Sequence, residues 1–122
     1  MRAAINRASA TEEFPIPEGC FILDTSNSDN DPELSIARAR VPPGVTTANH
    51  TVEGTVERYL ILSGRGEVDV DGLDGWQPVL PGDVVVIPPG VRQRVRNTGA
   101  QDLVFYCMCS PRFRQENYRH LD

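Results

Sequence analysis

The stretch GVTTANHTVEGTVERYLILSG, residues 44–64, decides the fold of this 122-residue chain. Glycine stands at both ends, where a chain that must reverse direction benefits from a residue without a side chain. Between them, Glu57, Tyr59 and Ile61 stand two residues apart. Side chains alternate between the two faces of a β-strand, so these three share one face. We therefore expect a strand whose inner face carries a carboxyl, a phenol and an aliphatic group, with His50 a short way upstream.

A second stretch, GDVVVIPPGVRQRVRN, residues 82–97, has a similar organisation. The prolines and glycine of IPPG predict the end of one strand and a tight turn. In the next strand, alternation places Gln93 on the same face as Val91 and Val95. A buried amide among valines needs a hydrogen-bond partner. The opposite face carries three arginines, Arg92, Arg94 and Arg96. These predict either a solvated face or a contact with a second protomer.

Short runs of strand-forming residues fill much of the remaining chain, between turns rich in glycine and proline. We predict strands at residues 21–24, 35–41, 58–62, 67–70, 83–87, 91–96 and 103–108. Strands at intervals of roughly 8 to 12 residues are typical of a β-sandwich or a small barrel. The predicted fold class is therefore all-β, in one domain, which 122 residues suffice to form.

The two ends of the chain lack this pattern. We expect residues 1–18 to form an N-terminal arm and residues 19–110 to form the barrel. In the tail, residues 111–122, a helix of about three turns would have Ser110 as its N-cap and Pro111 at its first position. The tail is thus predicted as a short helix or an extended segment. Its three arginines, which could cover the barrel mouth or simply be solvated, are Arg112, Arg114 and Arg119.

Charge and composition argue against several classes of function. The formal net charge of -5 opposes binding to nucleic acid, whose phosphates repel an acidic protein. No stretch approaches the ~20 apolar residues of a membrane span, and the first residues lack the apolar core of a signal peptide. The three cysteines, Cys20, Cys107 and Cys109, do not have the spacing of a disulfide framework. We expect reduced thiols and a cytoplasmic protein.

The first stretch resembles the first motif of the cupin superfamily, whose members are double-stranded β-helix, or jelly-roll, barrels. That motif places five residues between a glycine and a histidine, as between Gly44 and His50 here. Val52 stands where the motif has a second histidine. The motif's glutamate and closing glycine follow at the expected spacing, as Glu57 and Gly64. The resemblance therefore covers every position of the motif except one.

The second stretch resembles the second cupin motif. Gly82, Pro88, Gly90 and Asn97 stand at the motif's spacing, and Gln93 replaces its histidine. With the flanking strands, the resemblance extends over nearly the whole domain. The chain is also similar to small single-domain cupins labelled as mannose-6-phosphate isomerase relatives. This resemblance implies a jelly-roll barrel with a small-molecule site in its mouth.

Metal-binding cupins hold a divalent ion with two histidines and a glutamate of the first motif and one histidine of the second. The resemblance implies His50, Glu57 and Gln93 as metal ligands here, although Gln93 offers only a neutral amide oxygen. Such a set favours manganese, iron, nickel or zinc, with Asn49, Glu53 or a cysteine as further ligands. The alternative is a metal-free pocket in which the carboxylate orients the imidazole and the pair performs acid–base chemistry.

Both alternatives predict the same site residues. The candidate catalytic residues are His50, Glu57 and Tyr59. The candidate substrate-binding residues are Tyr59, Gln93 and Cys109. Tyr59 could equally be a core aromatic, and Cys107 and Cys109, which share a strand face, could be small buried hydrophobes.

The resemblance implies two classes of function. One is an isomerase, lyase or oxygenase acting on a sugar-like or small carboxylate substrate. Its reaction would be proton abstraction beside a carbonyl, with Glu57 or His50 as the base and a metal or Gln93 polarising the oxygen. The other is a ligand-binding or sensor barrel without turnover. We expect a homodimer in either case.

Overall fold

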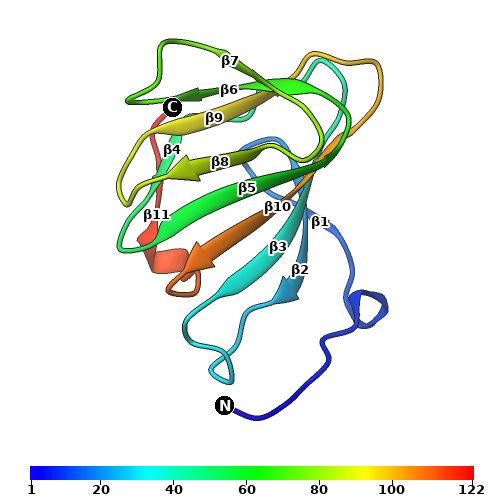
Figure 1. The fold of residues 1–122 in the computed structure, drawn as a ribbon, viewed down its shortest axis with the longest axis vertical. Helices are drawn as coiled ribbons and strands as arrows, with labels where there is room; N and C mark the ends of the chain where they lie inside the picture. The colour runs from blue at the N-terminus through cyan, green and yellow to red at the C-terminus, as the bar shows by residue number, and fades with distance from the viewer.

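The structure, a computed structural model, describes residues 1–122 as two antiparallel β-sheets that face each other (Figure 1). The first sheet contains, in spatial order, β1 (Phe14–Pro15), β2 (Phe21–Ser26), β3 (Ser35–Val41), β10 (Leu103–Ser110), β5 (Val56–Ser63) and β8 (Val84–Ile87). The second contains β11 (Tyr118–His120), β4 (His50–Val52), β9 (Gln93–Asn97), β6 (Gly66–Val70) and β7 (Gln77–Val79). The predicted all-β class and cupin-type barrel are confirmed.

The long strands lie close to their predicted positions. β3 has the predicted bounds, residues 35–41. β5 begins two residues before its predicted start and ends one residue after its predicted end, and β10 ends two residues later than predicted. Four strands were not predicted, namely β1, β4, β7 and β11. Each has only two or three residues, which is too short for the alternation of apolar and polar side chains to be recognised.

The tail is not an α-helix, so of the two predicted forms the extended one is found. A single 3₁₀ turn, η2 (Gln115–Asn117), leads into β11, which pairs with β4. The backbone N–H of Arg112 donates to Pro32 O at 3.1 Å, and that of Phe113 to Ser35 Oγ at 2.9 Å. The N–H groups of this segment therefore bond to residues that are distant in sequence. An isolated helix of the same length would be only marginally stable in water.

The N-terminal arm is partly built into the barrel. After a 3₁₀ turn, η1 (Ala8–Ala10), strand β1 pairs with β2, with Phe14 opposite Ile22. The backbone of Ile16 then bonds to Cys20, which closes the turn into β2. Residues 14–18 are therefore part of the sheet and its adjoining turn. No helix in the structure has the length and apolar character needed to cross a membrane.

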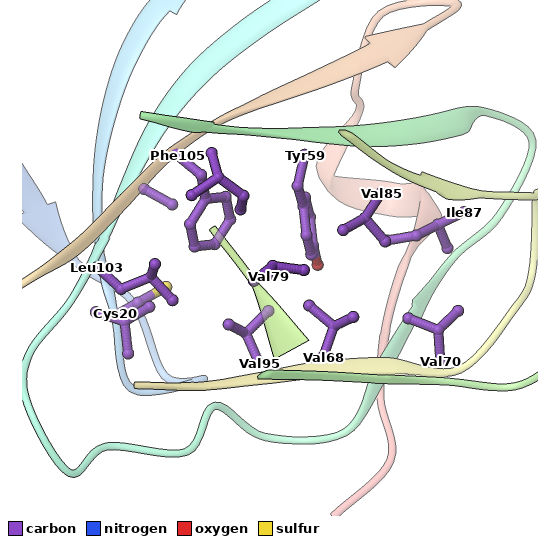
Figure 2. Packing of buried hydrophobic residues seen from close by; sticks show 13 residues of the cluster. Cys20, Tyr59, Val68, Val70, Val79, Val85, Ile87, Val95, Leu103 and Phe105 are labelled. Carbon is purple, nitrogen blue, oxygen red and sulfur yellow. The ribbon is translucent and has the colours of Figure 1, made fainter. Parts of the chain in front are cut away.

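The core lies between the two sheets, where inward side chains of both meet (Figure 2). Tyr59 reaches from β5 toward Val68 and Val95 on the facing sheet, and its ring lies 4.7 Å from that of Phe105. Glu57, Tyr59 and Ile61 are all buried, as the alternation in the sequence predicted. The inner face of β5 therefore contributes both to the apolar core and to a polar region beside it.

The outer arginine face of β9 is electrically neutralised. Arg92 bonds to both Asp69 and Asp71 at 2.9 Å, Arg94 bonds to Asp69 at 3.0 Å, and Arg96 bonds to Glu67 at 2.6 Å. The guanidinium groups of Arg94 and Arg96 also lie over the Trp76 ring. The arginines are thus neither free in solvent nor an open basic patch. The homodimer stays a prediction.

Two glycines with positive φ allow a matched test of how closely the turn after β5 approaches the start of β10. Gly64 (φ +81°) and Gly82 (φ +92°) both adopt backbone conformations that disfavour a side chain, at about 1–2 kcal/mol. A Cβ at Gly64 would lie 2.4 Å from Asp102 O, whereas one at Gly82 would meet nothing within 4 Å. We expect G64A to lower the free energy of unfolding in urea clearly more than G82A does. Equal losses would contradict the close approach at Gly64.

Candidate functional site

A cavity of about 690 Å³ opens between the sheets, beside the apolar core. Four of the predicted site residues line it, namely His50, Glu57, Tyr59 and Cys109. Both terminal segments complete its wall, from Phe14 to Glu18 and from Arg112 to Tyr118. The structure therefore brings candidate residues from β4, from the first half of β5 and from the end of β10 to one space. Asn49 and Glu53 lie outside it.

Gln93 is enclosed behind the cavity wall, with 1% of its surface exposed. The Tyr59 hydroxyl donates a hydrogen bond to Gln93 Oε1. Because this oxygen accepts from the phenol, the amide nitrogen of Gln93 faces the other way, toward Glu57. Burial raises the pKa of Tyr59 well above its ordinary value, so the phenol remains a donor. The sequence predicted the inward direction of Gln93, and its partner is Tyr59.

His50 is held in one orientation. Its Nδ1 lies 3.0 Å from Ala48 O. A carbonyl oxygen only accepts, so Nδ1 carries the proton in the neutral ring and Nε2 carries the lone pair. Nε2 makes no hydrogen bond within the protein. The ring stacks on Tyr118, with 5.3 Å between centroids, and is 4% exposed as a residue. His50 is therefore a positioned base at the cavity wall.

Glu18 is a site residue that the sequence did not reveal. Its Oε2 lies 3.5 Å from His50 Nδ1 and accepts a hydrogen bond from the Tyr118 hydroxyl at 3.2 Å. Its other oxygen accepts from the Cys20 thiol at 3.4 Å. The residue belongs to the segment predicted as an arm, and no periodicity or motif there could have indicated it. A carboxylate beside Nδ1 stabilises the ring when it takes up a second proton.

Glu57 is a buried carboxyl group with an unfilled acceptor. Burial raises its pKa, against the opposing influence of the His50 charge and of hydrogen bonding from Gln93 and Cys109. Its Oε1 atom is buried and has no hydrogen-bond partner. An unpartnered buried carboxylate oxygen is unfavourable, and a proton on the group reduces that penalty. Glu57 is therefore suited to hold a proton beside the cavity.

No disulfide joins the three cysteines, and both cysteines of β10 line the cavity. Burial, followed by the charge of Glu57, raises the pKa of Cys109 to about 12. Burial also raises the pKa of Cys107. Thiolates, not thiols, are the nucleophiles and metal ligands of proteins. At neutral pH these side chains act as small apolar wall groups with a weak S–H donor.

The residues present do not fit a metal ion held in the way that the resemblance implied. Val52 offers no donor atom, and the Gln93 oxygen already accepts from Tyr59. His50 and Glu57 alone remain, and the structure holds no cluster of three or more His, Cys, Asp or Glu side chains placed to bind a metal. Protein sites for zinc and similar ions usually supply at least three ligands.

Two facing antiparallel sheets around an internal cavity lined by both apolar and polar side chains define a jelly-roll barrel with a built interior site. The sequence profile of the cupin domain matches residues 37–109. The chain belongs to the cupin family. It is 39% identical over 69 residues to the oxalate-binding protein of Thermotoga maritima, a match that covers 57% of this chain and 55% of that protein. The matched region thus spans about half of that relative's length.

Two solved structures are similar. Pac13 of Streptomyces, a nucleoside dehydratase, superposes with a TM-score of 0.81 over 98% of this chain and 92% of that one, at 18% identity. A predicted oxalate decarboxylase from Thermotoga maritima superposes with a TM-score of 0.75 over 88% and 99%, at 26% identity. None of these proteins is a mannose-6-phosphate isomerase, so that resemblance stays a prediction.

The raised pKa of Glu57 predicts a specific dependence of stability on pH. The folded chain holds this proton more tightly than the unfolded chain, so the stabilisation is complete below the ordinary value of 4.5 and is lost as pH rises through the folded pKa. E57Q cannot ionise. We expect its free energy of unfolding, measured in urea, to rise relative to wild type as pH increases above about 4.5.

The control for this measurement is E33Q, which removes an exposed glutamate that makes no hydrogen bond. Its difference from wild type is expected to stay small and nearly flat with pH. A flat difference for E57Q as well would contradict the buried, proton-holding carboxyl.

Proposed function

We propose that this cupin is an acid–base enzyme that needs no metal and acts on a small polar molecule containing a carbonyl group. The reaction is proton transfer beside the carbonyl, which leads to isomerisation or to elimination of a β-substituent. The observation that carries the proposal is the pairing of His50, with Nε2 unbonded, and Glu57, with a raised pKa, on one cavity wall.

The two groups have complementary proton states. His50 Nε2 takes the proton from the carbon next to the carbonyl, and the electron pair of that C–H bond moves toward the carbonyl oxygen. Glu57 donates its proton to that oxygen, which gives an enol. Efficient catalysis of this kind requires one group placed to accept a proton and another placed to donate one.

The enol then has two outcomes. If the carbon that lost its proton carries a hydroxyl, the enol is an enediol. His50 then gives its proton to the former carbonyl carbon while Glu57 takes the proton of that hydroxyl, so the carbonyl moves and the reaction is an isomerisation. If a hydroxyl on the β-carbon leaves with the His50 proton as water, while Glu57 recovers its proton, the reaction is a dehydration. The likeness to a nucleoside dehydratase supports the second outcome. Sugar-like compounds and small carboxylates with this arrangement fit a cavity of about 690 Å³.

Surrounding residues position this pair. Glu18 lies beside Nδ1 of His50 and stabilises the imidazolium that forms when Nε2 takes up a proton. Gln93, fixed by the Tyr59 hydroxyl, lies against Glu57. Because no third side chain is placed to bind a metal together with His50 and Glu57, no step of the proposed reaction passes through a metal.

Proton exchange tests the proposal without knowledge of the substrate. Aldoses, ketoses, 2-oxo acids and β-hydroxy carbonyl compounds are incubated with the protein in D2O, and loss of the C–H signal is followed by proton NMR. We expect exchange on at least one class of compound, slowed by about 10²–10⁴-fold in H50Q and in E57Q. The matched controls are H120Q, an exposed histidine, and E53Q, an exposed glutamate outside the cavity.

Treatment with a chelator is expected to leave the exchange rate unchanged. Loss of exchange on chelation, restored by manganese, iron, nickel or zinc, would overturn the metal-free reaction. A second candidate function is ligand binding without turnover, which the name of the oxalate-binding relative favours. Thermal shifts that depend on His50, together with no exchange on any compound, would identify that function instead.

A further inference from the structure

The rim of the cavity carries two arginines that the reaction proposed above does not use. The rim segment, residues 112–116, lies between β10 and β11 and lines the cavity. It contributes Arg112 and Arg114, which stand on either side of Phe113. Of the three tail arginines, Arg119 alone is outside the cavity lining. Of the two alternatives predicted for the tail arginines, a position at the barrel mouth thus applies to Arg112 and Arg114.

Arg112 is fixed in place by a loop of the first sheet. Its Nη1 donates to Asn27 Oδ1 at 2.9 Å, and its Nη2 donates to Asp29 Oδ1 at 2.6 Å. The side chain is 16% exposed, whereas Asp29 is 92% exposed. Its Nε atom is buried and has no acceptor. A buried guanidinium N–H without an acceptor is unfavourable, and an additional oxygen at the rim would relieve it.

Arg114 has the opposite character. Its side chain is exposed and makes no hydrogen bond or ion pair. The backbone on each side is nevertheless held, because Phe113 O accepts from Asn27 Nδ2 at 2.9 Å and Arg114 O accepts from the N–H of Asn117. The rim segment therefore presents one anchored and one unpaired guanidinium from a fixed backbone.

We propose that the cavity takes an anionic ligand, whose carboxylate or phosphate group binds Arg112 and Arg114 at the rim while the rest of the molecule extends toward His50. Guanidinium groups bind planar carboxylates and phosphates through paired N–H donors. The rim also carries Asp24 and Glu116, both exposed, so selection rests on the placement of the arginines and not on net charge. The inference rests on the proposed function for the direction of the bound molecule.

Binding of simple anions tests the inference without any turnover. The probes are malonate, inorganic phosphate and the uncharged analogue malonamide, compared at constant ionic strength by calorimetry and thermal shift. We expect malonate or phosphate to bind and malonamide not to bind. R114Q is expected to weaken anion binding by about tenfold or more, the effect of losing one charge-assisted hydrogen bond. If malonate binds more tightly than phosphate, the acidic group of the ligand is a carboxylate; if phosphate binds more tightly, it is a phosphate.

R65Q is the matched control, since it removes another exposed arginine without a partner, outside this cavity. It is expected to bind the anions as wild type does. R112K tests the anchored position while keeping its charge, and it is expected to weaken anion binding because a lysine lacks the fork of donors.

H50Q separates the two proposals. It is expected to slow proton exchange by about 10²–10⁴-fold and to retain anion binding, because His50 does not contact the rim group. Equal binding of malonate and malonamide, or equal weakening by R114Q and R65Q, would overturn the anionic ligand while leaving the acid–base reaction intact.

Discussion

The inner face of β5 is the constraint on which the rest of this protein depends. Alternation along the strand turns Glu57, Tyr59 and Ile61 to the same side, and pairing with β10 and β8 directs that side toward the opposite sheet. Ile61 packs in the core at little cost. The carboxyl and the phenol must find partners within the barrel, because water does not reach them freely. The polar interior is therefore a consequence of placing these residues on a central strand.

Most of the barrel could be predicted from local sequence, because its determinants are periodic. Strands of five or more residues show enough alternation to fix both their position and their inner face, as β3 and β9 illustrate. For Gln93, the same reasoning gave burial among valines and the need for a partner, and an exposed fraction of 1% agrees with it. Alternation predicts which face of a strand a side chain lies on, but not which residue of another strand it contacts. Tyr59, 34 residues earlier in the chain, could therefore not be identified as that partner.

The rest of the site depends on contacts between segments far apart in sequence. Glu18 reaches His50 because β1 and its turn pack along β2, and Tyr118 reaches Glu18 because β11 pairs with β4. Both terminal strands are too short to carry a pattern. The tail illustrates the same limit, since its helix signals at Ser110 and Pro111 were local. Hydrogen bonds to the loop before β3 and to β4 outweighed them, and no property of the tail alone could have indicated those partners.

The two departures from the cupin motifs, Val52 and Gln93 in place of histidines, both affect Glu57. A metal ion beside Glu57 would favour the charged carboxylate and lower its pKa. With Val52 apolar and the Gln93 oxygen committed to Tyr59, that cation has too few ligands, and burial becomes the largest influence on Glu57. Burial thus shifts the pKa of this carboxyl in the direction opposite to the shift that a bound metal ion would cause. The two imidazoles missing from the motif thus leave Glu57 as a buried carboxyl with a raised pKa, on the same cavity wall as His50, whose Nδ1 is tied to Ala48.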